Sequence, residues 1–404
     1  MFEEYVWADA PDFKDPKATQ AVEPLIDRML DYGKPYYVPN EDAWYISKYK
    51  DIDTILRDRT TSSDRLGWFY KRLPKEKQAF IDPLYKVLSR WLINVDEPDH
   101  KPIRSSMQKA FTSSIVKSWE EWLEKASDDL VGKLAKGKEI EVVSQIALPI
   151  PILLICEMLG IPENETDIAK NHYRDIVNFI DESNDPQIAM AAIKSNAVLH
   201  EYFGNKLKNV DKMADVNLMK YLSNLSEEIS KDDIAANSSL LLGAGHETTA
   251  SLIAALVMMT YRDRKLLEFL KSSPDKIDAL IEESLRLYPP VQRTSRIIQQ
   301  DYEIEGVKIP SGSRCMLFWA AANRDPDKFD NPHEISLERG RNPHFAFSSG
   351  IHYCVGANVA RLEARIILKH LLDKADDFQL SGDALEWMEN STFRCLKSLR
   401  LVKA

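Results

Sequence analysis

Cysteine and glycine are both scarce in this chain, and long apolar runs are absent. Its 404 residues include only four cysteines, which lie too far apart for C-x-x-C metal pairs and make a disulfide framework unexpected. Only 14 residues are glycine, and no Gly/Ser-rich or Pro-rich linker divides the chain. We therefore expect a reducing, cytoplasmic setting and a mainly helical chain with few breaks.

Positively charged residues are also fewer than negatively charged ones. Asp and Glu number 63 against 53 Lys and Arg, which gives a formal net charge of −10. A chain this acidic is a poor candidate for general nucleic-acid binding, because the DNA or RNA backbone repels it. Apolar residues make up 44% and charged residues 29%, a composition typical of a globular protein that buries a large core without disulfide or metal staples.

Neither a signal peptide nor a membrane span is predicted. The acidic, aromatic N-terminus lacks the basic start and apolar run of a signal peptide. The longest apolar run, Ile146–Cys156, is too short to cross a bilayer. A longer stretch, Ser238–Tyr261, carries His246 and Glu247 at its middle, where a charge costs about 3 kcal/mol in a membrane. This stretch therefore predicts a buried helix of a water-soluble protein.

Alternating apolar patterns predict small β parts on a large helical body. Two pairs of short strands flank turns that contain proline, and each pair predicts a hairpin: 36–38 with 44–47, and 302–309 with 314–318. We expect a single domain over residues 1–404, with β-rich parts at about 36–60 and 300–320 and a helical body for the rest.

One predicted helix is unusually apolar. It runs from about Lys231 to Asp263, and Ser230 with Asp233 forms a predicted capping pair at its start. Glu247 is the only formal charge along its interior. A helix that is apolar on nearly all sides must be buried, so we expect it to cross the centre of the protein.

Two further helices border candidate sites. The first begins at Ser273–Pro274 and ends before Pro289. The second follows Gly356 and has apolar residues at helical spacing.

The segment Phe347–Gly356 stands just ahead of that last helix. Cys354 would lie at the helix amino end, where unpaired N–H groups and the helix dipole favour a thiolate. Gly350 and Gly356 allow close approach of a bulky partner. Taken alone, Cys354 is a structural thiol, a nucleophile or a metal ligand, and its position does not decide between the three.

The pattern around Cys354 narrows these alternatives. Residues 347–356 (FSSGIHYCVG) resemble the haem-binding loop of the cytochrome P-450 family, F-[S/G]-x-G-x-H-x-C-x-G. Other motifs of that family follow in its order over essentially the whole chain: His100…Arg104, Ala244-Gly245-His246-Glu247-Thr248-Thr249, Glu283…Arg286, Asn323-Arg324-Asp325-Pro326 and Arg339…Asn342-Pro343-His344.

The resemblance implies a mainly α fold with small β-sheets, a triangular helical body with a long central helix, and a bound haem b. It implies that the Cys354 thiolate is the proximal ligand of the haem iron and that Phe347 packs beside the porphyrin, although an ordinary core aromatic is the alternative for Phe347. Four side chains are placed by resemblance to pair with the two haem propionates: His100, Arg104, Arg296 and His352.

The same resemblance assigns roles near the oxygen site. Glu247 and Thr248 become the acid and alcohol that deliver protons, and Ala244 and Gly245, which lack bulk, leave room for dioxygen. A helix distortion without a proton role is the alternative for Thr248. A structural network is implied for Glu283, Arg286 and Arg339, of which the first two lie at i and i+3 on one helix.

The implied reaction is the insertion of one oxygen atom from O2 into a hydrophobic small molecule that the sequence does not identify. Substrate contacts are placed by resemblance at about 171–200 and at Trp91, Leu92, Leu241, Leu242, Val291 and Phe393, most of which are equally good core residues. Electrons would come from an external ferredoxin or flavodoxin with its reductase, because the chain has no flavin or iron–sulfur motif. Candidate docking cations are Lys101, Arg104, Lys109 and Arg361, for which solvated surface charge is the alternative.

Other functions remain as alternatives. A relative that uses peroxide, and a haem sensor or carrier without turnover, share the cysteine loop. A cysteine hydrolase is disfavoured because His352 lies too close to Cys354 in sequence to act as its base. Residues 246–250 begin like the zinc motif H-E-x-x-H but end in alanine, and residues 243–245 lack the rest of a dinucleotide fingerprint.

Overall fold

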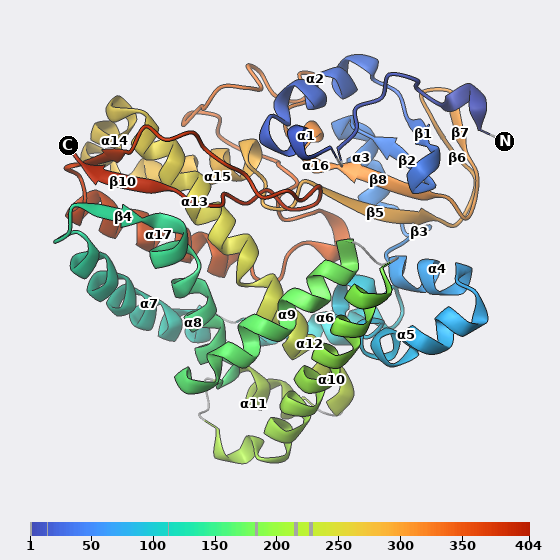
Figure 1. The fold of residues 1–404 in the computed structure, drawn as a ribbon, viewed down its shortest axis with the longest axis horizontal. Helices are drawn as coiled ribbons and strands as arrows, with labels where there is room; N and C mark the ends of the chain where they lie inside the picture. The colour runs from blue at the N-terminus through green and yellow to red at the C-terminus, as the bar shows by residue number, and fades with distance from the viewer. Residues whose placement is uncertain (1, 14, 112, 182–184, 214–216, 226–228) are drawn as a thin grey trace. The chain divides into compact units, whose positions relative to one another are not determined.

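The computed structural model describes residues 2–13, 15–111, 113–181, 185–213, 217–225 and 229–404 (Figure 1). The chain forms two compact units. The larger unit comprises Met1–Ser62, Glu124–Pro149 and Thr248–Ala404, and the smaller unit comprises Ser63–Leu123 and Ile150–Glu247. The single domain expected over residues 1–404 stays a prediction.

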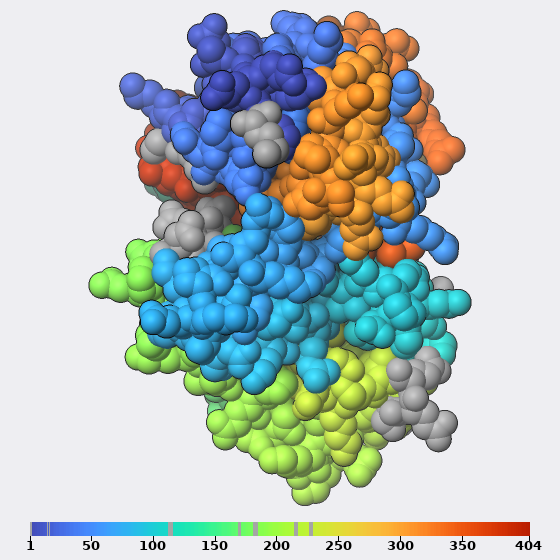
Figure 2. Space-filling view, turned by 90° about the vertical axis from the view of Figure 1, so that its right-hand side faces the viewer, coloured from blue at the N-terminus to red at the C-terminus, as the bar shows by residue number. Residues whose placement is uncertain are grey.

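The smaller unit is helical. Its helices, two of which (α7 and α8) continue into the larger unit, are α4 (Arg65–Arg72), α5 (Lys75–Leu88), α6 (His100–Ala110), α7 (Ser113–Leu134), α8 (Pro149–Leu159), α9 (Thr166–Asp181), α10 (Pro186–Lys208), α11 (Leu218–Ser223) and α12 (Lys231–Ala244). In Figure 2, α4 and α5 (light blue) form one continuous area of its surface. The long α10 packs against α9, α12 and α5.

Local signals explain where two of these helices begin. At α10 the Asp185 carboxylate accepts a hydrogen bond from the Gln187 N–H at 2.7 Å, and Pro186 occupies the first turn. At α12 the predicted capping pair is present, because Ser230 and Asp233 bond to each other's backbone N–H. Both ends are thus fixed by side chains that the sequence supplies locally.

Every strand of the described residues lies in the larger unit. A five-stranded sheet has the order β1 (Tyr36–Val38), β2 (Ala43–Ile46), β8 (Arg314–Phe318), β5 (Arg293–Ile298) and β3 (Thr61–Ser62). β6 (Tyr302–Ile304) pairs with β7 (Val307–Ile309), and a three-stranded sheet has the order β4 (Glu139–Glu141), β10 (Arg400–Lys403) and β9 (Phe378–Leu380). β2 and β8 are parallel, whereas β5 and β8 are antiparallel.

Helices cover these sheets on the larger unit (Figure 1). They are α1 (Pro16–Gln20), α2 (Glu23–Tyr32), α3 (Tyr49–Arg57), α13 (Glu247–Arg262), α14 (Arg264–Ser272), α15 (Ile277–Leu287), α16 (Trp319–Ala322) and α17 (Ala357–Lys374). Two apolar clusters pack on the five-stranded sheet, one around Trp44 and Leu317 and the other around Tyr45 and Phe318. Because side chains alternate along a strand, neighbouring residues of β2 and β8 belong to the clusters on opposite faces of the sheet.

The mainly α fold with small sheets is confirmed, and so is the first hairpin, β1–β2. The second predicted hairpin is wrong. Residues 302–309 fold back on themselves at Glu305 and Gly306, which both have positive φ, and β8 instead joins β5 and β2. The expected β-rich part at 36–60 is also only partly strand, since α3 occupies its second half.

The predicted helix from Lys231 to Asp263 is interrupted. α12 ends at Ala244 and α13 begins at Glu247, because the His246 N–H bonds to the Gly243 carbonyl at 3.2 Å in place of an i−4 partner. The whole stretch Lys231–Arg262 is long and apolar enough to cross a membrane, but 67% of its most apolar window is buried inside the protein. That burial is typical of a core helix.

Candidate functional site

The cysteine loop belongs to the larger unit and ends at α17. The Cys354 N–H donates to the Phe347 carbonyl at 2.9 Å, which closes the loop, and the short helix η8 (Gly350–His352) lies between them. Gly356 is the residue before α17. Cys354 is therefore exposed at the amino end of an 18-residue helix, where the helix dipole favours a thiolate.

The loop needs glycine at one position. Gly350 has φ +69°, and a Cβ there would lie 2.6 Å from the Leu56 carbonyl oxygen at the end of α3. Gly356 differs, because a Cβ there would meet nothing within 4 Å. Packing within the chain therefore does not explain why residue 356 is glycine. The absence of a side chain leaves open space beside Cys354.

None of the four cysteines, all of which lie in the described residues, is disulfide-bonded. Cys315 is buried, and burial raises the pKa of its thiol, so it stays protonated. Cys354 is the exposed one. The sulfur with the best access and the best electrostatic setting is thus the one in the loop.

A brace that sequence reasoning missed holds this loop. The Arg361 guanidinium lies 4.5 Å from the centre of the Phe347 ring and donates to both oxygens of Glu282, at 2.6 and 2.9 Å. His344 bonds to the same carboxylate at 3.2 Å. Burial alone would raise the pKa of Glu282, but these two partners hold it at about 2. Arg361, one of the predicted docking cations for an electron donor, pairs with Glu282, and its docking role stays a prediction.

The donor set suits a metal that brings most of its own ligands. Among the described residues no group of three or more His, Cys, Asp or Glu side chains could hold a metal ion. A lone thiolate with open space beside it fits haem, because the porphyrin would supply most of the ligands of its iron and the protein would need to provide only a sulfur donor. The residues present therefore fit the implied cofactor.

The predicted propionate partners fall in both units. In the larger unit Arg296 is buried on β5, where it donates to the Ser295 carbonyl at 3.0 Å, and His352 is half-buried in η8. In the smaller unit His100 and Arg104 lie one turn apart on α6, and His100 is 1% exposed. Burial and the charge of Arg104 lower the pKa of His100.

Glu247 and Thr248 lie at the interruption between α12 and α13. Both are half-buried and Ala244 is exposed, although residues 234–240 and 249–261 are buried. This is the accessible part of an otherwise enclosed stretch. Burial raises the pKa of Glu247, and the positive charge of Arg174 on α9 offsets part of the effect.

The structure brings Glu283, Arg286 and Arg339 together. Arg286 is fully buried and bonds to both oxygens of Glu283, at 2.8 and 2.9 Å, and Arg339 bonds to one of them at 3.0 Å. Glu283 also accepts from the Ser336 N–H and from Asn342. The group is a fully engaged structural network, far more than the i, i+3 pair visible in the sequence.

The predicted substrate-contact residues differ in burial. Trp91 and Leu92 are buried, and Trp91 donates to Ser239 Oγ at 3.3 Å, so both act as core residues of the smaller unit. Leu242 is buried and Leu241 half-buried on α12. In the larger unit the structure brings the two other predicted residues together as an isolated bridge, Val291 with Phe393.

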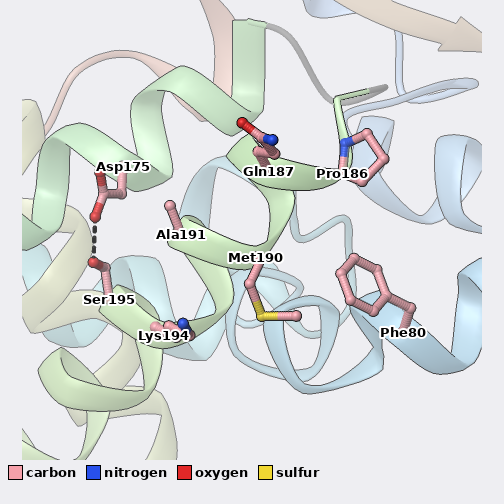
Figure 3. Close-up of a pocket in the computed structure, with 8 residues that line it drawn as sticks. All are labelled: Phe80, Asp175, Pro186, Gln187, Met190, Ala191, Lys194 and Ser195. Atoms are coloured by element: carbon pink, nitrogen blue, oxygen red, sulfur yellow. Dashed lines mark hydrogen bonds between the residues drawn. The ribbon is translucent and has the colours of Figure 1, made fainter.

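A groove of about 690 Å³ lies between α5, α9 and α10 (Figure 3). Phe80 and Met190 face each other across it, and Lys194 lies along one side. At its floor the Ser195 hydroxyl donates to Asp175 at 2.5 Å and bonds to His172 at 2.9 Å. Apart from Phe80, the lining falls in the predicted substrate range 171–200, of which residues 182–184 lie outside the described residues.

Comparison with known proteins gives one family throughout. Residues 259–381 match the family model described as Cytochrome P450. A cytochrome P450 of Bacillus subtilis (strain 168) is 30% identical over 399 residues, which cover 96% of this chain and 92% of the relative. The cytochrome P450 CYP107DY1 of Priestia megaterium is 30% identical over 400 residues, or 96% of this chain and 94% of that protein.

Solved structures agree. P450BioI, determined in complex with acyl carrier protein ligated by hexadec-9Z-enoic acid, has a TM-score of 0.89 and 26% identity, covering 96% of this chain and 99% of that chain. CYP109B1 from Bacillus subtilis has a TM-score of 0.83 and 28% identity, covering 95% and 100%. The chain therefore belongs to the cytochrome P450 family, whose members bind haem b and act as monooxygenases.

Proposed function

We propose that this P450 inserts one oxygen atom from O2 into a hydrophobic small molecule in the cytoplasm, using electrons from an external ferredoxin- or flavodoxin-type donor and its reductase. The observation that carries the proposal is Cys354, the exposed thiol at the amino end of α17, in a loop that Gly350 and the Arg361–Glu282 pair hold in place. When bound, haem b supplies the activation of dioxygen and the oxidation of the C–H bond.

The chain's own residues would hold the cofactor. Cys354 binds the iron as thiolate, and Phe347, which Arg361 pins from one side, keeps water from the sulfur. Arginine and histidine side chains would pair with the two propionates, which would be costly to bury unpaired: His100, Arg104, Arg296 and His352.

Glu247 and Thr248 would deliver protons. Because burial raises the pKa of Glu247, this carboxyl holds a proton more readily than an exposed glutamate does. Thr248 follows it directly at the start of α13, so its hydroxyl can pass a proton on. Ala244 and Gly245 leave the accessible stretch without bulk.

The groove between α5, α9 and α10 supports a hydrophobic substrate, because the apolar side chains of Phe80 and Met190 face each other across it, while the polar residues Asp175, Gln187, Lys194 and Ser195 lie along the rest of the lining. Relatives of this fold were solved with corticosterone and with myristic acid, ligands of that general kind. Widening the groove with Met190→Ala should change the range of apolar molecules that shift the haem spin state. An unchanged range would remove the groove from the substrate's path.

An acidic electron donor would meet the exposed cations Lys101 and Lys109 of α6. Reduction by an acidic ferredoxin should slow at high salt and with Lys109→Glu, whereas the exposed Lys133→Glu on α7 should leave it unchanged. Reduction rates that change with neither the salt concentration nor Lys109→Glu would refute this docking site.

The deciding measurement is the absorption spectrum of the reduced protein under carbon monoxide. The strongly red-shifted band of thiolate ligation should appear in the wild type and in Cys315→Ala, and should be lost in Cys354→Ser. A colourless protein that stays colourless with added hemin would refute the proposal. Efficient turnover with peroxide alone would favour a peroxide-using enzyme, and ligand binding without product would favour a sensor or carrier.

A further inference from the structure

The ring of Tyr173, on α9, lies against the backbone of α12 at Gly243. A Cβ added at Gly243 would lie 1.6 Å from Tyr173 Cζ and 1.9 Å from each Cε atom. Any side chain at position 243 would therefore displace the ring. A glycine inside an apolar helix usually has a packing reason, and here the reason is this contact.

A second aromatic side chain contacts the ring. Trp91 stacks on Tyr173 with ring centres 6.4 Å apart and planes 20° apart. Trp91 is itself fixed to α12, because its indole N–H donates to Ser239 Oγ, and the next N–H, that of Leu92, donates to Asn237 at 2.8 Å. Tyr173 thus contacts both the backbone of α12 and an aromatic side chain that is anchored on α12.

The contact point is one turn before Glu247. Gly243 precedes Glu247 by four residues, and the bond from the His246 N–H to the Gly243 carbonyl tightens the turn between them. The negative charge of Glu247 adds to the effect of burial in raising the pKa of Tyr173, so the two side chains lie within electrostatic reach. The ring therefore lies beside the turn that carries the acid.

Side chains from two other helices also border this turn. From α9, Arg174 is the positive charge that acts on Glu247. From α8, the apolar side chain of Ile155 lies 3.5 Å from a Cβ placed at Gly245. His246 is the neighbour in sequence.

The remaining titratable groups of this part of α9 point elsewhere. His172 and Asp175 both bond to Ser195 of α10. They anchor α9 to α10. Tyr173 instead contacts α12 at Gly243, and Arg174 interacts electrostatically with Glu247.

We propose that Tyr173 is a positioning residue for Glu247, whose ring closes the turn between Gly243 and the acid and limits the access of water to the carboxyl group. The inference deepens the proposed function and rests on the role given there to Glu247. A carboxyl group that bulk water solvates would lose the rise in pKa that burial gives it, and with it part of its capacity to hold a proton.

Three variants separate the ring from the hydroxyl. Tyr173→Ala removes the ring, Tyr173→Phe keeps it, and Gly243→Ala pushes it away without changing residue 173. Tyr70→Ala is the matched control, because Tyr70 stacks on Tyr85 at 4.0 Å in the same unit, on α4 and α5.

The readout is the titration of the Glu247 carboxyl by infrared spectroscopy of the holoenzyme, with the band assigned by its loss in Glu247→Gln. Tyr173→Ala and Gly243→Ala should lower its midpoint by about one pH unit as water reaches the group. Tyr173→Phe and Tyr70→Ala should leave the midpoint in place, and the yield of product per electron should follow the midpoint in every variant.

An unchanged midpoint in Tyr173→Ala would overturn the proposal, as would an equal shift in Tyr173→Phe. If Gly243→Ala does not fold, the comparison of Tyr173→Ala with Tyr173→Phe still tests the positioning role of the ring. If Glu247→Gln keeps the wild-type yield, the proton role of Glu247 fails, while the infrared titration still tests the positioning by Tyr173.

Discussion

The buried carboxylate of Glu283 makes the sharpest stability prediction. It is fully buried and accepts bonds from Arg286, Arg339, Asn342 and the Ser336 N–H. Glu283→Gln keeps the size of the side chain but removes the charge and part of the acceptor capacity, so both arginines lose their counter-ion.

Breaking a buried ion pair by removing one partner costs about 3–5 kcal/mol, because the remaining charge stays buried without compensation. We expect Glu283→Gln to lower the free energy of unfolding by that amount. The matched control is Glu268→Gln, which breaks the pair with Arg264 on the surface of α14. Exposed pairs contribute about 0–1 kcal/mol, so the control should change little.

The assay is guanidinium unfolding followed by tryptophan fluorescence, with haem content measured in parallel. Burial alone would raise the pKa of Glu283, but Arg286 lowers it below the usual carboxyl range. Its contribution is therefore present above the ordinary carboxyl pKa and is lost as the pH falls through the lowered one. A loss of stability no larger than that of Glu268→Gln at neutral pH would refute this reasoning.

Three further predictions concern the loop and the proton path. Thr248→Ala should keep haem and substrate binding but divert electrons into hydrogen peroxide, and an unchanged product yield per electron would exclude a proton role. Gly350→Ala should reduce the haem content of the purified protein, because φ is +69° and the new Cβ would lie 2.6 Å from the Leu56 carbonyl; normal haem content would contradict this. Since Glu282 has a pKa of about 2, its contribution to stability is complete above the ordinary carboxyl pKa and is lost toward pH 2. Arg361→Ala should therefore move acid unfolding to higher pH, as measured by circular dichroism, and an unmoved midpoint would argue against the brace.

Features that depend on a few neighbouring residues could be predicted from the sequence. The Ser230–Asp233 cap, the start of α17 after Gly356 and the β1–β2 hairpin all arise from local chemistry. The cysteine loop belongs to the same class, because its glycines and its helix are adjacent in the chain.

Features that depend on partners far along the chain could not be predicted. β8 pairs with β5 and β2, and this pairing buries the apolar clusters on both faces of the sheet. No local pattern in the sequence predicts which strands pair. Arg361 meets Glu282 across 79 positions, so its charge alone suggested a surface role. The interruption at residues 245–246 was invisible because apolar residues continue through it. Gly243 did give a signal, an isolated glycine in a helix, but its partner Tyr173 could not be named.

The order of the segments in the larger unit also bears on biosynthesis. Strand β10 pairs on one side with β4, where Arg400 faces Glu141, and on the other with β9. On the ribosome, β4 emerges long before β10 and keeps an open edge until residues 400–403 have been translated. The smaller unit, complete once residue 247 has emerged, can fold earlier. Chaperone protection should therefore matter most for the nascent β4 region, and a premature stop before residue 400 should yield an aggregation-prone product.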